Sequence, residues 1–365
     1  MEKFFEKYML NNGVELKNRL VMAPMTTYSA NEDDTVSNEE LVYYFERSGG
    51  VSMVITAAAY VSKNGKGFPG QISAHDDIYI PSLRKIARAI KAQGARAILQ
   101  IFHAGRQSPP QLVPDGEIVG ASSITSDEKQ PPRPLKTEEV QQIVKDFYEA
   151  TRRAIQAGFD GVEIHGANTY LIQQFFSGFT NDRSDIYGGT VEKRLRFPLE
   201  ILSAVNFAKA RFSISDFIVG YRFSPEESEE AGITLDQTLY LIDALADEKL
   251  TYLHASLSRF DTKPHRYSGE EKTTVAALQK VINGRVPLIS VGSIYTRDDF
   301  KRATETEADL LAIGRELLIE PYWVEKLQNE EAFETELDID APKALPKNLL
   351  NKLLSHPGWV PVKNQ

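Results

Sequence analysis

Residues 158–170 read Gly-Phe-Asp-Gly-Val-Glu-Ile-His-Gly-Ala-Asn-Thr-Tyr. A long helical segment stops at Gly158, and the apolar run from Gly161 to Ile164 is typical of a strand. The strand carries His165 at its C-terminal end, and Asn168 and Tyr170 follow within the next turn. An imidazole, a carboxamide and a phenol at the mouth of a strand can bind an electron-rich oxygen and donate a proton near it. From this run alone an alternative stays open, in which His165 caps a strand and Tyr170 packs in a core.

Seven further apolar runs flank this one, and helical patterns separate them. Their continuous apolar character suits parallel strands that are buried on both faces. Eight strands alternating with helices predict a (β/α)₈ TIM barrel. A doubly wound sheet is the competing fold, but it would need a G-x-G-x-x-G after an early strand, and the sequence has none. The eight predicted strands are Leu20–Ala23, Ser52–Thr56, Ala95–Gln100, Gly161–His165, Phe217–Arg222, Tyr252–Ala255, Pro287–Val291 and Asp309–Gly314.

Local signals add detail to this barrel. Ser37 with Glu40 and Thr234 with Gln237 predict capping boxes at two helix starts. Asn12-Gly13 predicts an N-terminal hairpin, which could plug the barrel floor. Residues 104–136, 177–190 and 257–270 are predicted long loops on the C-terminal face, where barrel active sites form. We expect one barrel domain over residues 1–340. The tail, residues 341–365, is expected to pack on the barrel or on a neighbouring subunit.

Composition limits the class of protein. The chain has 365 residues, a net charge of −9 and no cysteine. The negative charge argues against a nucleic-acid surface, and the absence of cysteine excludes disulfides, thiolate nucleophiles and iron–sulfur clusters. No apolar stretch approaches a membrane span, and the histidines show no metal-ligand spacing. We expect a cytoplasmic protein with a small-molecule substrate, and leave open whether it forms a homo-oligomer.

The ends of the last two strands suggest an anion site. Gly292 and Gly314 lie where barrels commonly bind phosphate through backbone amides and a helix N-terminus. Arg315 adds a bidentate donor. In the alternative interpretation, the glycines are plain turns and Arg315 forms a surface ion pair.

Five runs together resemble the Old Yellow Enzyme family of FMN-dependent ene-reductases, over roughly residues 4–330. They are NRLVMAPMT at residues 18–26, QIFHAGR at 100–106, EIHGANTYLIQQF at 163–175, NDRSDIYGG at 181–189 and IGREL at 313–317. Each run is a modest signal alone, but their order and their placement at strand ends make the combination specific.

The resemblance implies non-covalent FMN at the C-terminal mouth of the barrel and NADH or NADPH as the electron donor. It implies that His165 and Asn168 bind a substrate carbonyl oxygen, that Tyr170 is the proton donor and that Tyr28 lies on the substrate side. The residues implied to hold the flavin are Pro24, Met25, Thr26, Ala57, Gln100, His165, Arg222, Gly292, Gly314 and Arg315. The implied reaction is reduction of the activated C=C bond of an α,β-unsaturated carbonyl compound.

Two other functions remain open at this stage. A barrel lyase or isomerase acting on a phosphorylated small molecule could use the same phosphate site, although such enzymes usually need a lysine or carboxylate at a strand end. A non-catalytic flavin or ligand carrier would bind FMN without turnover. Thr26 stands where one family branch has a redox-tuning cysteine, and Asn168 replaces a second histidine, so the flavin potential is undetermined. The physiological substrate and the choice between NADH and NADPH are also open.

Overall fold

The protein is described by a computed structural model that covers residues 1–125 and 130–363. Eight parallel strands form a closed barrel in the order β4-β3-β13-β12-β11-β10-β9-β6, and β4 pairs with β6 to complete the ring. The predicted barrel is therefore confirmed and the doubly wound sheet is wrong. The barrel strands are β3 (Leu20–Met22), β4 (Met53–Ile55), β6 (Arg96–Phe102), β9 (Gly161–Gly166), β10 (Ile218–Phe223), β11 (Tyr252–Ala255), β12 (Leu288–Val291) and β13 (Leu310–Ile313).

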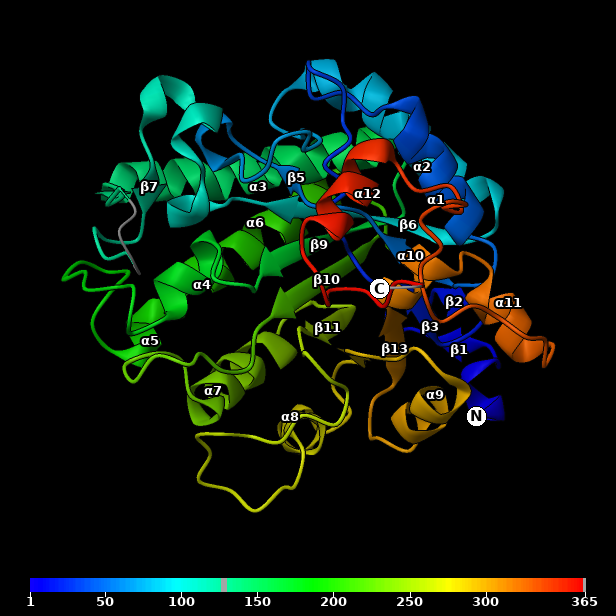
Figure 1. The fold of residues 1–365 in the computed structure, drawn as a ribbon. Coiled ribbons are helices and arrows are strands. Elements are labelled where there is room, and N and C mark those ends of the chain that lie inside the picture. The colour runs from blue at the N-terminus through cyan, green and yellow to red at the C-terminus, as the bar shows by residue number, and fades with distance from the viewer. Residues whose placement is uncertain (126–129, 364–365) are drawn as a thin grey trace.

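Helices surround this barrel (Figure 1). Both predicted capping boxes are present, at Ser37 with Glu40 and at Thr234 with Gln237. Gly158 ends the longest helix with φ 87°, a left-handed conformation that glycine adopts without steric cost. The helices are α1 (Asn38–Arg47), α2 (Ile80–Ala92), α3 (Thr137–Ala157), α4 (Leu171–Phe176), α5 (Val191–Arg194), α6 (Arg196–Arg211), α7 (Leu235–Ala246), α8 (Thr274–Ile282), α9 (Arg297–Thr304), α10 (Arg315–Ile319), α11 (Trp323–Gln328) and α12 (Lys347–Leu354). Within the described residues, no helix combines the length and apolarity needed to cross a bilayer.

The N-terminal hairpin closes one end of the barrel. Strands β1 (Tyr8–Met9) and β2 (Glu15–Leu16) pair antiparallel around the predicted turn. Leu10, Val14 and Leu16 belong to the same apolar cluster as inward-facing strand residues such as Ile98 and Ile218. The hairpin thus fills the floor and leaves the opposite mouth for chemistry.

The loops at the other end are long, as predicted. Residues 104–136 contain only short turns and the two-residue strands β7 (Val119–Gly120) and β8 (Arg133–Pro134), with residues 126–129 lying outside the described part. Strand β5 (Ala59–Tyr60) extends the sheet beside β6.

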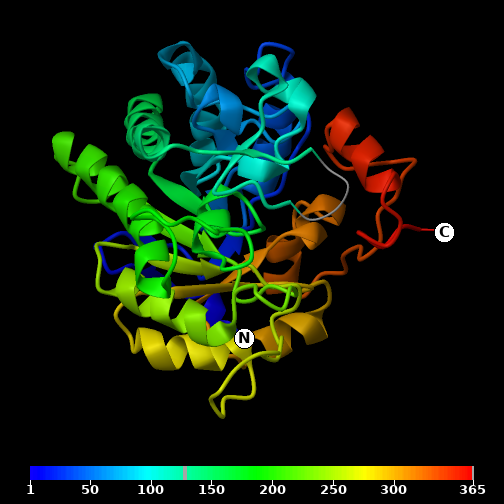
Figure 2. The ribbon, with the colours of Figure 1, turned by 90° about the vertical axis from the view of Figure 1, so that its left-hand side faces the viewer.

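The C-terminal segment lies against its own chain. Two views show α12 and the residues after it on one face of the barrel (Figures 1 and 2). The backbone amide of Lys347 donates to Glu39 of α1, and Leu337 forms a parallel bridge with Val362. Residues 364 and 365 of the predicted tail lie outside the described residues.

Candidate active site

A cavity of about 240 Å³ opens at the C-terminal ends of the barrel strands. Three substrate-side residues, His165, Asn168 and Tyr170, line it together with Tyr28. The same cavity contains most residues predicted on the flavin side, namely Pro24, Met25, Thr26, Gln100 and Arg222. Residues from distant parts of the sequence, from Pro24 to Trp359, therefore meet at one place.

His165 is buried at the end of β9 and is a neutral imidazole. Burial, with Arg222 nearby, lowers the pKa of His165 to about 3. Its Nδ1 accepts a hydrogen bond from the backbone amide of Ala167 at 3.3 Å. The single ring proton must then be on Nε2, which makes that nitrogen a hydrogen-bond donor.

Asn168 is oriented by a short polar chain. Nη2 of Arg222 donates to Oγ of Ser256 at 3.1 Å, and Ser256 donates to Oδ1 of Asn168 at 3.1 Å. Because the carboxamide oxygen is occupied, the NH₂ group is the end of Asn168 left for a ligand. Asn168 and Thr169 both have positive φ, 59° and 64°, and this unusual turn holds Asn168 at the cavity mouth.

Tyr170 stands in an aromatic surround. Its ring makes edge contacts with Phe102, His165 and Phe68 at centroid distances of 4.5, 5.1 and 6.0 Å. Burial raises the pKa of Tyr170 above the usual value of a phenol. The hydroxyl is therefore protonated throughout the physiological range.

A buried hydrogen-bond network lies below the cavity and is centred on Glu163, two residues before His165. The Glu163 carboxylate accepts from Nε2 of Gln100 at 2.7 Å, from the hydroxyl of Tyr252 at 3.0 Å and from Nδ1 of His254 at 2.9 Å. Burial acts to raise the pKa of Glu163, but His254, Arg222 and Gln100 outweigh it, and the pKa is lowered. The network therefore contains a carboxylate ion that holds the Gln100 amide in place.

A second cavity, of about 340 Å³, adjoins the first and contains the predicted phosphate residues Gly292, Gly314 and Arg315. Arg315 donates to Oγ of Ser293 at 2.8 Å. Gly292 has φ 126°, and a side chain there would meet the backbone of Arg259 at 2.6 Å. The glycine thus permits a close backbone approach that other residues would prevent.

The donor set of the two cavities fits FMN. Pro24, Met25 and Arg222 line both cavities, so one elongated molecule could span them. Nε of Arg222 is buried without a hydrogen-bond partner among the described residues, which leaves a donor for a ring oxygen or nitrogen. Arg315 supplies positive charge at the far cavity, which suits a phosphate.

One residue implied to contact the flavin, Ala57, lines neither cavity, and its contact with FMN stays a prediction. Its neighbour Ala58, between β4 and β5, lines the first cavity. The backbone amide of Ala57 donates to the Tyr44 hydroxyl at 2.8 Å, and its carbonyl accepts from Thr56. Both backbone groups of Ala57 are therefore engaged within the protein.

Sequence reasoning missed Glu163, His254, Ser256 and the position of Trp359. The backbone carbonyl of Trp359 accepts from Nη1 of Arg315 at 3.1 Å, and this residue lines both cavities. This segment of the C-terminal tail therefore lies over the site of its own chain. His103, in the run after β6, is buried and accepts from the Gly105 amide at 3.0 Å.

A closed barrel with two adjoining cavities at the C-terminal ends of its strands, lined by groups that fit FMN, agrees with a flavin-dependent oxidoreductase. The sequence pattern of the NADH:flavin oxidoreductase / NADH oxidase family matches residues 3–334, and the chain belongs to that family. It is an NAD(P)H-dependent enzyme that uses FMN, and it is related to Old Yellow Enzyme.

Individual relatives agree with this assignment. A protein of Bacillus subtilis (strain 168) described as a probable NADH-dependent flavin oxidoreductase is 48% identical over 364 residues, covering 99% of this chain and 98% of that protein. An NADH:acrylate oxidoreductase of Vibrio harveyi is 40% identical over 94% of this chain, which spans 35% of that protein's length.

Solved structures show the same fold. Morphinone reductase superposes with a TM-score of 0.77 at 28% identity and 91% coverage of both chains. An Old Yellow Enzyme homologue of Zymomonas mobilis has a TM-score of 0.79 at 25% identity, covering 94% of this chain and 99% of that one.

Proposed function

We propose that this protein reduces the activated C=C bond of α,β-unsaturated carbonyl compounds with electrons from NADH or NADPH. The observation that carries the proposal is the convergence of His165, Asn168 and Tyr170 on one cavity beside Gln100 and Arg222. FMN bound across the two cavities would supply reversible hydride transfer. Pro24, Met25, Thr26, Gln100 and Arg222 would contact its ring, and Gly292, Gly314 and Arg315 its phosphate.

His165 and Asn168 bind the carbonyl oxygen of the substrate. The Nε2–H of His165 and the NH₂ of Asn168 are the two donors left over after their internal hydrogen bonds are counted. Negative charge grows on that oxygen as hydride reaches the β-carbon, and donors already aimed at it stabilise the charge without reorganisation. Since His165 is neutral near pH 7, this stabilisation comes from hydrogen bonding and not from an imidazolium charge.

Tyr170 delivers the proton. Its raised pKa keeps the phenol protonated until the α-carbon becomes basic. Hydride at the β-carbon and the Tyr170 proton at the α-carbon give the saturated carbonyl product, and water restores the phenol proton. Tyr28, on the substrate side of the same cavity, shapes the space for the acceptor.

The alternative lyase or isomerase has little support in the site. Among the described residues that line the two cavities, none is a lysine, an aspartate or a glutamate. Two relatives are named NADH:acrylate oxidoreductase and NADH:fumarate oxidoreductase, and acrylate and fumarate are both activated alkenes. This chain spans 35% and 38% of the lengths of these two relatives.

The test follows the visible spectrum of the purified protein with FMN under anaerobic conditions. We expect bleaching by NADH or NADPH and return of the oxidised spectrum on adding 2-cyclohexen-1-one, with acrylate and fumarate tested in parallel. Tyr170→Phe should slow the return step while leaving bleaching unchanged. Equal slowing of both steps, or no effect on either, would refute the role of Tyr170. A reducible flavin that no alkene reoxidises would favour the non-catalytic carrier.

A further inference from the structure

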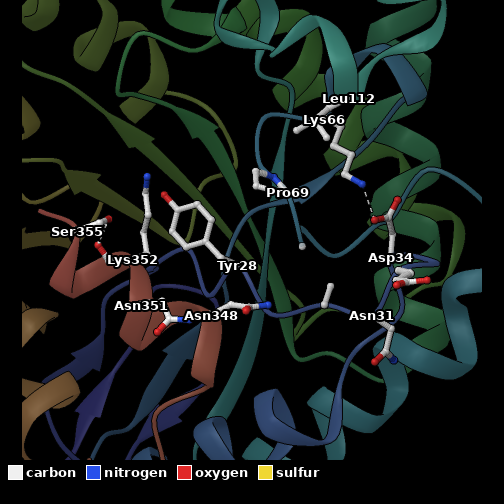
Figure 3. Close-up of a pocket in the computed structure, with 13 residues that line it drawn as sticks. Tyr28, Asn31, Asp34, Lys66, Pro69, Leu112, Asn348, Asn351, Lys352 and Ser355 are labelled. Atoms are coloured by element: carbon white, nitrogen blue, oxygen red, sulfur yellow. Dashed lines mark hydrogen bonds and ion pairs between the residues drawn. The ribbon is translucent and has the colours of Figure 1, made fainter. Parts of the chain in front are cut away.

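A third pocket, of about 610 Å³, lies beside the active-site cavity (Figure 3). Tyr28 lines both of them, so this residue forms the shared wall. One side of the pocket is made by the loop after β3 with Lys66, and the other side by α12 near the C-terminus. None of the residues implied to bind FMN lines this pocket.

Helix α12 turns a polar stripe toward the pocket. The four residues of α12 and its end that line it are Asn348, Asn351, Lys352 and Ser355. Their spacing of i, i+3, i+4 and i+7 places them on one helix face. Leu349 and Leu353 are buried on the side that packs on the barrel. The helix therefore anchors itself with leucines and presents amides, a hydroxyl and a cation to the pocket.

The cation of Lys352 lies beside the shared wall. Its Nζ is 5.6 Å from the centroid of the Tyr28 ring, and Figure 3 shows the two side chains next to each other. Among the residues that the structure describes, no carboxylate lies within 4.0 Å of this ammonium group. Lys66, the other lysine of the pocket, is by contrast paired with Asp34 on the opposite side. Lys352 is thus the charge available to an anion at the Tyr28 end.

We propose that this pocket binds the ADP half of the reduced nicotinamide dinucleotide, with Lys352 at the pyrophosphate. The inference rests on the proposed function, because the nicotinamide must reach the flavin in the cavity next to Tyr28. That cavity, at about 240 Å³, would also hold the flavin ring, so it cannot take a whole dinucleotide. The remainder must leave it, and the pocket across Tyr28 offers volume, amide donors and an unneutralised cation.

The far end of the pocket favours NADH over NADPH. Asp34 accepts from the Tyr60 hydroxyl at 2.7 Å and also pairs with Lys66, so the lysine at this end of the pocket is already neutralised. Glu32, in the same turn and also lining the pocket, is exposed and adds a second carboxylate. These acids can accept from ribose hydroxyls but repel a 2′-phosphate.

The first experiment measures anaerobic reduction of the enzyme-bound FMN by stopped flow at increasing NADH. Lys352→Ala should raise the dissociation constant for NADH about tenfold, with the limiting rate of reduction little changed. Lys352→Arg should restore most of the affinity. Lys347→Ala is the matched control, because it removes the same charge from the same helix outside the pocket. Reoxidation by 2-cyclohexen-1-one should be the same in all four proteins.

A second experiment probes the pocket without the nicotinamide. ADP-ribose should compete with NADH and lose potency about tenfold in Lys352→Ala. It should not compete with 2-cyclohexen-1-one in the reoxidation step. The kcat/KM of the wild type should be about tenfold higher with NADH than with NADPH. Glu32→Gln should reduce this ratio of kcat/KM values about threefold.

The outcomes separate the two proposals. If the wild-type flavin is reduced by neither nucleotide, the proposed function fails. If NADH reduces the wild type but Lys352→Ala and Lys347→Ala bind NADH equally well, the pocket proposal alone is overturned. A preference of the wild type for NADPH would overturn the inference that Glu32 and Asp34 repel a 2′-phosphate.

Discussion

Replacing Glu163 by leucine should destabilise the protein and weaken FMN binding together. Leucine removes the acceptor for three buried donors, on Gln100, Tyr252 and His254, which lie 2.7, 3.0 and 2.9 Å from the carboxylate. Each stranded donor costs about 1–3 kcal/mol, and the losses overlap because the donors share one site. We therefore expect the free energy of unfolding to fall by about 3–5 kcal/mol, the range for breaking a buried charged pair.

Glu163→Gln separates the charge from the hydrogen bonds. Glutamine keeps the shape and one acceptor oxygen, and the Tyr252 hydroxyl can rotate to accept from the new NH₂, so the expected loss is only about 1–2 kcal/mol. Both variants remove a negative charge below the flavin. The reduction potential of bound FMN should therefore rise in both, on the order of 30 mV, which corresponds to about 1.4 kcal/mol for two electrons.

Three measurements test these predictions for the Glu163 variants. Urea unfolding of the FMN-free protein gives stability, fluorescence titration gives the FMN dissociation constant, and a dye-equilibrated reduction gives the potential. The reasoning is refuted if Glu163→Leu lies within 1 kcal/mol of wild type with unchanged FMN affinity, or if the potential falls in either variant. A purely structural role would lower stability in both variants without moving the potential in Glu163→Gln.

Three further changes have defined outcomes. Ser256→Ala breaks the link between Arg222 and Asn168, so the KM for 2-cyclohexen-1-one should rise about fivefold; an unchanged KM would mean that Asn168 is oriented without it. Trp359→Ala should lower the KM for bulky enones but leave FMN affinity unchanged, since Arg315 contacts only the backbone carbonyl of Trp359; weaker FMN binding would contradict this. Burial, with Glu320 nearby, raises the pKa of Glu316 to about 9, so this carboxyl stabilises the fold below about pH 4.3 and that contribution is lost as the pH rises toward 9. Between pH 5 and 9, the free energy of unfolding of the wild type should fall by about 1.4 kcal/mol per pH unit because of this group, and Glu316→Gln should remove that fall. Urea unfolding at several pH values measures it, and an identical pH slope in both proteins would refute the prediction.

Strand positions were predictable because the barrel strands are buried on both faces and so form continuous apolar runs. Because strands of this kind are parallel, the residues at their C-terminal ends could be assigned to one mouth of the barrel. The same strands also contain a period of two that the sequence reasoning did not use. Gln100, Glu163, Arg222 and His254 are inward positions on four successive strands, and Ser256 is the next inward position after His254. Glu163 is an acidic residue at an inward position of an otherwise apolar run. This was the sequence signal that could have predicted the buried hydrogen-bond network.

The C-terminal segment could not be placed in this way, because its position depends on contacts between distant parts of the chain. Its polar stripe was readable as a helix face, but Tyr28 lies more than 300 positions earlier and nothing local joins the two. The same holds for Ala57, whose backbone groups are taken by Tyr44 and Thr56 through packing that no motif encodes.

Charge is arranged in layers along the barrel axis. The carboxylate of Glu163 lies below the cavity, where it accepts from Gln100, whereas the cation Arg222 lines both cavities and Arg315 lines the second. His165 sits one inward position above Glu163 but remains neutral, because burial and Arg222 outweigh the attraction of the carboxylate. In the proposed reaction, neutral His165 would stabilise the charge that grows on the substrate oxygen by hydrogen bonding, and protonated Tyr170 would pass a proton to the α-carbon.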